Sequence, residues 1–496
     1  MLQQHFEFIV GNPPWLSYRY IADQNYQDEV RYRTLTQYGL LPRDKRALFT
    51  QMELASVFLA HSLAAFGKEN AQLAFVMPRA LLTADQHAGL RQGSYRAAAP
   101  VVLERYWDMM HVTPLFNVPC CVLFARHGQA KWAGKSYTLP AVEFSGTLPQ
   151  RNAAWEIASP NLTEKPRTGR LVFLGARNAF STSVGAARPT KPSVYQKRFA
   201  QGATIVPRNL YFVEVPDLHK PAKPDFAYRA NTDEDQARTA KKPWNDVRMN
   251  GRVEARFLFA VPLSKHLLPF VITQPGTAML PFQRSSDSAR MLDVKALRKE
   301  GWRDAASWMA DAERFWVEKR PNSAKELSPG QWLDYQGKLT NQTFRKDDWA
   351  VLYNASGTNL SAAYVKANAF ALPLAVDHKL YWYTTQSEDE AAYLVAILNS
   401  AFTNDAIKPF QSTGQQGERD IHKKPLELPI PLFDQDEPLH AELSELGQRA
   451  TLEAASLVSL PDFPSNLAGR RRFVREHLID VRKRINAATK HVLAGG

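Results

Sequence analysis

The sequence has little cysteine and no long apolar run. Its 496 residues include two cysteines, the adjacent Cys120 and Cys121, which lie in an apolar pattern typical of packing residues and are too few for a disulfide framework or a cysteine metal site. Neither a signal peptide nor an apolar stretch long enough to span a bilayer is found. These absences argue against disulfide-rich secreted and membrane proteins and predict a cytoplasmic one.

Several chemistry-bearing motifs are also missing. The chain has no G-x-G-x-x-G turn, no P-loop, no internal repeat and no clustered PD…ExK nuclease signature, although scattered carboxylates leave a degenerate nuclease site open. His422 has no second ligand at metal spacing, so no metal site is predicted.

The charge balance is strongly basic. The chain has 62 Lys and Arg against 49 Asp and Glu, a formal net charge of +13, with a pI near 9.5. With 45% hydrophobic and 11% aromatic residues it is globular in composition. The charge favours a nucleic-acid partner, because phosphates attract a basic surface; a merely basic globular protein is the alternative.

The most informative segment is the run Phe6–Trp15, FEFIVGNPPW. Its apolar start suits a strand buried on both faces, as in a parallel sheet. Ligands bind at the carboxyl ends of such strands, where the Asn12 side-chain oxygen and the Pro13 carbonyl can accept hydrogen bonds from an amine. Pro13 and Pro14 stiffen the turn. Trp15 offers a stacking face worth about 1–3 kcal/mol per base.

At these residues the chain resembles the S-adenosylmethionine-dependent amino-methyltransferases, above all the N6-adenine DNA methyltransferases, whose catalytic motif is Asn-Pro-Pro followed by an aromatic residue. The segment Gln72–Leu82, QLAFVMPRALL, is similar to the family's next strand and proline turn. The segment Leu115–Phe124, LFNVPCCVLF, is similar to its late motif, in which a phenylalanine packs against the flipped adenine.

The resemblance implies methylation of adenine N6, in which Asn12 and the Pro13 carbonyl accept hydrogen bonds from the amine. It implies that Trp15 stacks on the base and that Phe116 supports its other side or edge. Tryptophan in place of the commoner Tyr or Phe leaves the target base less certain than the reaction. The family's Asp-Leu-Tyr-like segment is replaced by Met52-Glu53-Leu54.

The family's cofactor motif, a strand and Gly-rich turn, lies upstream of Asn-Pro-Pro, and only five residues precede Phe6. We therefore expect a methyltransferase sheet cut through its middle, with an exposed apolar edge at Phe6–Val10. The S-adenosylmethionine site is expected from the missing part of a longer enzyme or from a partner polypeptide.

The predicted fold class is α/β: the C-terminal half of a Rossmann-like methyltransferase sheet, then a mixed α+β target-recognition domain and a helical tail. We expect a partial catalytic domain over residues 1–130, a connector or small strand-rich insertion over 131–195, a recognition domain over 196–435 and a helical hairpin over 436–496.

The third region resembles the target-recognition domains of restriction-modification and phage-defence methyltransferases, in a helix with a Leu-Asn-Ser end and in the segment Leu428–Pro431, LPIP. Double-stranded DNA is the implied partner. The predicted DNA contacts lie in polar loops where cations can reach phosphate or guanine, with solvated surface charge as the alternative for each: Arg208, Arg419, His422, Lys423 and Lys424. A basic stretch from Arg470 to Arg484 in the tail either follows DNA or is a solvated helix face.

Two other interpretations stay open. The chain is also compatible with a catalytically inactive DNA-recognition subunit that tethers a nuclease or helicase. Because Asn-Pro-Pro-aromatic serves any planar amide or amine, a protein-glutamine or RNA methyltransferase is the other alternative.

Overall fold

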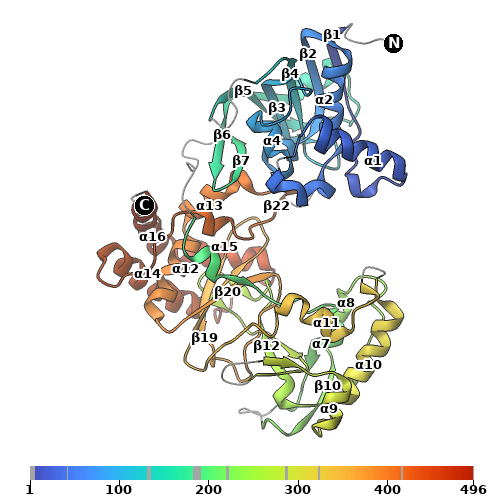
Figure 1. Cartoon of the computed structure of the whole chain (residues 1–496). Coiled ribbons are helices and arrows are strands. Elements are labelled where there is room, and N and C mark those ends of the chain that lie inside the picture. The colour runs from blue at the N-terminus through green and yellow to red at the C-terminus, as the bar shows by residue number, and fades with distance from the viewer. Residues whose placement is uncertain are drawn as a thin grey trace. The chain divides into compact units, whose positions relative to one another are not determined.

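The computed structural model describes residues 6–41, 43–130, 136–182, 192–218, 223–284, 289–321, 324–414 and 417–494. The chain divides into two compact units. Unit 1 comprises Met1–Pro192 with Asp405–Asp420, and unit 2 comprises Ser193–Asn404 with Ile421–Gly496. Figure 1 labels their elements along the chain.

Unit 1 is built on one mixed sheet of seven strands in the order β1-β2-β4-β3-β5-β6-β7. The β1/β2 and β3/β5 pairs are parallel and the other neighbours are antiparallel. The strands are β1 (Phe6–Gly11), β2 (Gly67–Pro78), β3 (Val101–Thr113), β4 (Cys120–His127), β5 (Thr138–Thr147), β6 (Leu162–Leu174) and β7 (Arg177–Ser181); a short pair, β21 (Thr413–Gly414) and β22 (Gly417–Glu418), is separate.

The α-helices of unit 1 are α1 (Gln24–Tyr32), α2 (Leu54–Phe66), α3 (Ala80–Thr83), α4 (Ala88–Gln92) and α5 (Trp155–Ala158). Helix α2 is rich in leucine and alanine, which favour helix, and it ends where Gly67 resumes extended backbone. Its side chains pack on one face of the sheet, with Leu73, Phe75 and Met77 of β2 in the same buried cluster. Cys120 and Cys121 are buried in β4, where burial raises the pKa of both thiols.

Strand β1 is the outermost strand of the sheet, as expected for a sheet cut at this point. The expectation that it is buried on both faces is wrong. Ile9 packs against the core, whereas Phe8 is 69% and Val10 81% exposed. Alternate residues of a strand face opposite sides, so only one face of β1 is covered by described residues.

Residues Thr138–Ser181 do not form a separate connector, because β5, β6 and β7 extend the sheet of β1–β4. Their alternating apolar residues, such as Leu139, Ala141 and Leu171, complete the same core. The late segment 405–420 also belongs to unit 1, which no local pattern indicates.

Unit 2 contains small antiparallel sheets, the largest with the order β19-β18-β20-β8. Its strands are β8 (Ala200–Gln201), β9 (Val213–Glu214), β10 (Ala227–Thr232), β11 (Asn250–Glu254), β12 (Leu258–Val261), β13 (Leu267–Leu268), β14 (Val271–Ile272), β15 (Gly276–Met279), β16 (Phe282–Arg284), β17 (Ala289–Met291), β18 (Trp349–Asn354), β19 (Ala362–Lys366) and β20 (Leu380–Thr385).

The helices that begin in unit 2 are α6 (Tyr195–Arg198), α7 (Arg208–Tyr211), α8 (Glu234–Arg238), α9 (Val294–Lys299), α10 (Arg303–Lys319), α11 (Pro329–Leu333), α12 (Glu388–Asn399), α13 (Ala401–Ile407), α14 (Pro438–Leu457), α15 (Leu467–His477) and α16 (Ile479–Ala494). Across the described residues, no helix is both long and apolar enough to cross a membrane.

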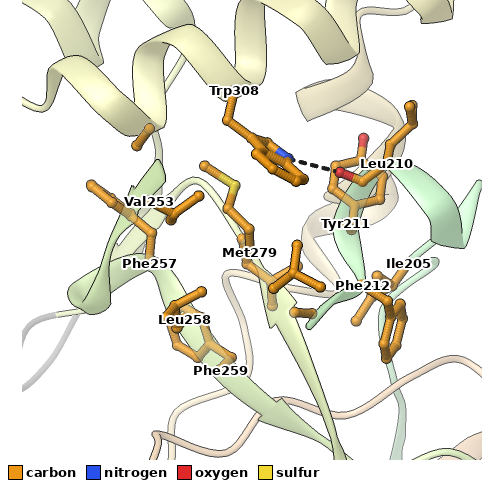
Figure 2. Close-up of a cluster of buried hydrophobic side chains, with 14 of the residues drawn as sticks. Ile205, Leu210, Tyr211, Phe212, Val253, Phe257, Leu258, Phe259, Met279 and Trp308 are labelled. Atoms are coloured by element: carbon orange, nitrogen blue, oxygen red, sulfur yellow. Dashed lines mark hydrogen bonds between the residues drawn. The ribbon is translucent and has the colours of Figure 1, made fainter. Parts of the chain in front are cut away.

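The main core of unit 2 gathers side chains from short elements far apart in sequence (Figure 2). Trp308 of α10 points into it beside Met279, and its indole Nε1 donates to the Leu210 carbonyl at 3.0 Å. The indole joins a large apolar area to a satisfied polar group, which is what a buried tryptophan requires.

The predicted tail hairpin forms as α14 followed by α15 and α16, and α14 packs on α12 and α16. Part of its basic stretch is structural. Arg471 Nη2 donates to the carbonyls of Ser264 and Leu267, and Arg475 Nη2 to the Leu360 carbonyl. Burial lowers the pKa of both side chains to about 10. These arginines therefore hold unit 2 together rather than form a solvated face.

The half-buried imidazole of His266 makes the stability of unit 2 dependent on pH. Its Nδ1 accepts from the Leu263 amide at 3.1 Å, and burial lowers its pKa to about 4. In the unfolded chain the imidazole binds a proton near pH 6.5, whereas in the folded chain it stays neutral down to about pH 4. The free energy of unfolding therefore falls as the pH drops from about 6.5 to 4, by up to about 3 kcal/mol.

The variant His266→Asn keeps a hydrogen-bond acceptor and removes the titrating group. Urea unfolding followed by circular dichroism should show a flatter pH dependence in the variant; equal losses would contradict this.

Candidate active site

Three loops converge at the carboxyl-terminal end of β1 and β2. These two strands are parallel, so both end on the same side of the sheet, and β4, which is antiparallel to β2, begins there. Three segments therefore lie at this end of the strands: the turn Asn12–Trp15, the turn at Pro78 and Arg79, and the loop Phe116–Pro119 that leads into β4. The Arg79 amide donates to the Pro119 carbonyl at 2.9 Å, which ties the second loop to the third.

The Asn-Pro-Pro-Trp turn is anchored at its aromatic end. Trp15 Nε1 donates to the Val76 carbonyl of β2 at 3.1 Å. The Leu54 amide donates to the Leu16 carbonyl at 2.9 Å, so the Met52–Leu54 segment, which replaces the expected Asp-Leu-Tyr, does lie against the turn. Pro13 is buried, whereas Asn12 is exposed. The turn is thus fixed while its amide is open to a substrate.

The structure brings Trp15 and Phe116 together from segments about a hundred residues apart. Their ring centroids are 4.7 Å apart and the planes are tilted by 52°. A base held between two rings needs about 3.5 Å on each side, so these rings must separate before a base enters between them. Phe116 is 42% exposed and lies in a loop, which makes it the ring more easily displaced.

Sequence reasoning missed an ion pair beside these loops. Arg79 Nη2 and Asp108 Oδ2 are 2.9 Å apart. Burial by itself lowers the pKa of Arg79, but the Asp108 carboxylate leaves it raised above its usual value. The pair lines a small cavity of about 200 Å³ in unit 1. The position of Arg79 directly after the proline turn was a signal in the sequence; nothing in the sequence singled out Asp108.

A chain of buried polar groups supports the start of α2. His87 Nε2 lies 3.0 Å from Glu53 Oε2, and its Nδ1 lies 3.1 Å from Ser56 Oγ. The residue types suggest a nucleophilic triad, but Ser56 and His87 are each only 1% exposed. Because that hydroxyl is buried, the three linked side chains hold Glu53, and with it Leu54, against the Asn12–Trp15 turn.

The predicted DNA contacts are divided between the units: Arg419 belongs to unit 1, and Arg208, His422, Lys423 and Lys424 belong to unit 2. Arg208 is paired with Asp377 at 3.1 Å. Lys423 Nζ donates to the Gln196 carbonyl at 2.7 Å, and Lys424 is 4% exposed.

Arg208 and Lys423 are thus engaged by partners within unit 2. His422 contacts the Tyr381 ring edge-on. Arg419 is exposed. A DNA-binding role for any of them stays a prediction.

No protein-family model matches the chain, and no curated protein matches it. Among solved structures it is similar to the Type IIL restriction-modification enzyme MmeI in complex with DNA, with a TM-score of 0.55 and 11% identity over 98% of this chain. The type IIG restriction endonuclease BpuSI (TM-score 0.26, 13% identity, 98% of this chain and 55% of that one) and the DrdV–DNA complex (0.35, 12%, 92% and 45%) are weaker matches that support no argument.

The chain spans 54% of the length of MmeI. At this identity the similarity shows the fold alone, and it confirms the predicted fold class: part of a methyltransferase-like α/β sheet followed by a mixed region and a helical tail.

The anchor of the Asn12–Trp15 turn is testable by removing one hydrogen bond. Trp15→Phe keeps a ring against Phe116 but loses the bond to Val76, so it should destabilise unit 1 by about 1 kcal/mol. Trp155→Phe is the matched control, because Trp155 is 55% exposed on α5. Urea denaturation with circular dichroism measures both. Equal midpoints for the two variants would show that the indole bond does not anchor the turn.

Proposed function

We propose that this chain is the adenine-N6 methylation and target-recognition part of a DNA restriction-modification or phage-defence enzyme. The single observation that supports the chemistry most is the Asn12–Trp15 turn at the carboxyl end of β1, with the Phe116 ring placed against Trp15 at 4.7 Å. The fold shared with MmeI, whose structure is in complex with DNA, and the net charge of +13 support DNA as substrate.

In this proposal the chain's own residues hold the target amine. The Asn12 side-chain oxygen and the Pro13 carbonyl accept its two N–H groups, which leaves the nitrogen lone pair available for attack. The stiff Pro13-Pro14 backbone keeps both acceptors in place without an ordering cost during the reaction. Trp15, fixed by its bond to Val76, stacks on the extruded base, and Phe116 moves to support it.

The proposed methyl donor is S-adenosylmethionine, but the described residues do not form a site for it. On the free side of β1, where the resemblance places the cofactor strand, the described residues contain neither a strand nor a Gly-rich turn. We therefore propose that a polypeptide segment outside these 496 residues, on the same chain or on a partner, supplies the cofactor site.

An uncovered apolar face of the sheet is evidence for such a segment. In the strand register Val10 lies beside Ala74, and Ala74 beside Phe124. All three are exposed or half-buried, as is Phe8. The opposite face is packed beneath α2, so one apolar face of the sheet is covered and the other is not. An apolar patch of this kind normally marks a contact with another polypeptide.

The alternative, a catalytically inactive recognition subunit, differs in one measurable way. It predicts that the complete wild-type enzyme, like its variants, binds DNA but transfers no methyl group to it. An RNA or protein substrate is distinguished by offering each polymer to the same preparation and identifying the methylated product by mass spectrometry.

Asn12→Ala tests the catalytic assignment in the complete enzyme. It removes one of two acceptors for the amine, so methyl transfer to DNA should fall by at least about a hundredfold while DNA affinity stays within about twofold. Asn161→Ala is the control, an exposed asparagine of unit 1 away from the turn. Transfer is measured as N6-methyladenine in digested DNA. An unchanged rate for Asn12→Ala would overturn the assignment.

Phe8→Asp tests the uncovered face. Because Phe8 is 69% exposed here, the isolated chain should fold and melt as the wild type does. In the complete enzyme the carboxylate would be buried against the cofactor segment, and affinity for S-adenosylmethionine should fall about tenfold or more. Leu452→Asp, at a position 74% exposed on α14, is the control. Calorimetric titration measures the affinity; equal values for Phe8→Asp and wild type would exclude this face as the contact.

A further inference from the structure

A large cavity, with a volume of about 850 Å³, lies within unit 2. It is lined by residues of the short helix Ala255–Phe257, of strands β12, β16 and β17, and of the loops 344–346 and 367–374. Three phenylalanines contribute rings to its wall: Phe259, Phe282 and Phe344. None of the DNA contacts predicted from the sequence lines it, and the proposed chemistry of unit 1 does not use it.

The cavity is cationic. Five basic residues line it, Arg256, Arg284, Arg290, Arg345 and Lys346, and the described lining residues include no carboxylate. Two of the five are neutralised nearby, since Arg256 pairs with Asp225 and Arg290 with Glu300. Among the described residues, the side chains of the other three have no carboxylate within ion-pair distance.

Arg284 is the unusual member of this set. Its guanidinium lies 5.4 Å from the ring centroids of Phe282 and Phe344 and 5.9 Å from that of Phe259. Its Nη1 and Nη2 reach only the Leu374 carbonyl, at 3.5 and 3.4 Å, and within the described part of the chain its buried Nε has no acceptor. Burial lowers its pKa to about 10, so it is still charged at neutral pH.

A charged guanidinium among aromatic rings, with a donor that has no acceptor and no carboxylate partner among the described residues, is costly unless an anion arrives. The low polarity that makes it costly also strengthens its bond to that anion, and the planar fork suits phosphate oxygens. Arg345 and Lys346 are exposed, on a loop that lines the same cavity, where they can attract a polyanion before it reaches Arg284.

We propose that this cavity binds the phosphodiester backbone of DNA, with Arg284 donating to a phosphate and with Arg345 and Lys346 contacting neighbouring phosphates at the rim. This inference rests on the proposed function, since it identifies where the recognition part holds its DNA. Such binding fixes the position of DNA without reading its sequence, because phosphates are the same at every base pair.

The test is DNA affinity as a function of salt concentration, measured by fluorescence anisotropy with a labelled duplex. Removing one bond to a phosphate should reduce the slope of log K against log salt by about one. Arg284→Gln should lower affinity about tenfold and the slope by about one, equally on unrelated duplexes. Arg284→Lys should retain most of the slope but bind more weakly, because a point charge replaces a fork. Arg314→Gln, at an exposed α10 residue paired with Asp311, should change neither.

The Arg284 variants are expected to fold, so a loss of DNA affinity would not reflect unfolding. Replacing the half-buried Arg284, which has no carboxylate partner among the described residues, by a neutral side chain is expected to preserve or raise the melting temperature. The double variant Arg345→Gln/Lys346→Gln, at two exposed positions, provides a second test with an expected slope reduction of about two.

Three outcomes would overturn the proposal. If wild type binds DNA and Arg284→Gln binds with the same affinity and slope, the cavity does not hold the backbone, and the proposed function is unaffected. If inorganic phosphate or dAMP binds the wild type through Arg284 while the salt slope for DNA is unchanged in the variant, the cavity is a site for a free phosphate compound. If the wild type binds no DNA at all, the proposed function fails together with this assignment.

Discussion

The parallel pairing of β1 with β2 is the constraint on which the Asn12–Trp15 turn and its neighbouring loops depend. Because both strands run in the same direction, their ends meet at one edge, and the antiparallel β4 starts there. That arrangement lets the Trp15 indole reach the Val76 carbonyl and the Arg79 amide reach the Pro119 carbonyl. Two hydrogen bonds across three loops thus place Asn12, Trp15 and Phe116 together. A shift of one residue in this register would turn every side chain of β1 to the opposite face and separate the turn from its anchor.

The same strand is covered on one face only by the described residues. One face of β1 and its neighbours packs beneath α2, while Phe8 and Val10 on the other face are exposed. The described residues accordingly leave both the backbone edge and one side-chain face of β1 uncovered. Both properties follow from β1 being the edge strand, since an edge strand presents unpaired backbone as well as uncovered side chains.

In unit 2 some arginines are bonded to groups of their own unit, whereas Arg284 lines a cavity. Arg471 and Arg475 are engaged by backbone carbonyls of their own unit, and Arg208 by Asp377. Arg284 differs because, in the part of the chain that the structure describes, its Nε has no acceptor, and it lines a cavity with two exposed cations. Net charge counts all of these equally, so it indicates that DNA is a plausible partner without indicating which residues meet it.

The amino-acid sequence alone was enough to predict the strand and the Asn-Pro-Pro-Trp turn, because these depend on short-range patterns: apolar runs, turn residues and spacing along the chain. The prediction of the Phe116 block and of the methyltransferase-like fold class rested on the resemblance to a known family. The sequence could not reveal that Thr138–Ser181 joins the same sheet, that residues 405–420 return to unit 1, or that Asp108 pairs with Arg79. Nor could it separate the structural arginines of the tail from Arg284 at its cavity. Those outcomes depend on which distant segments pack together, and burial, pairing and accessibility exist only once they have done so.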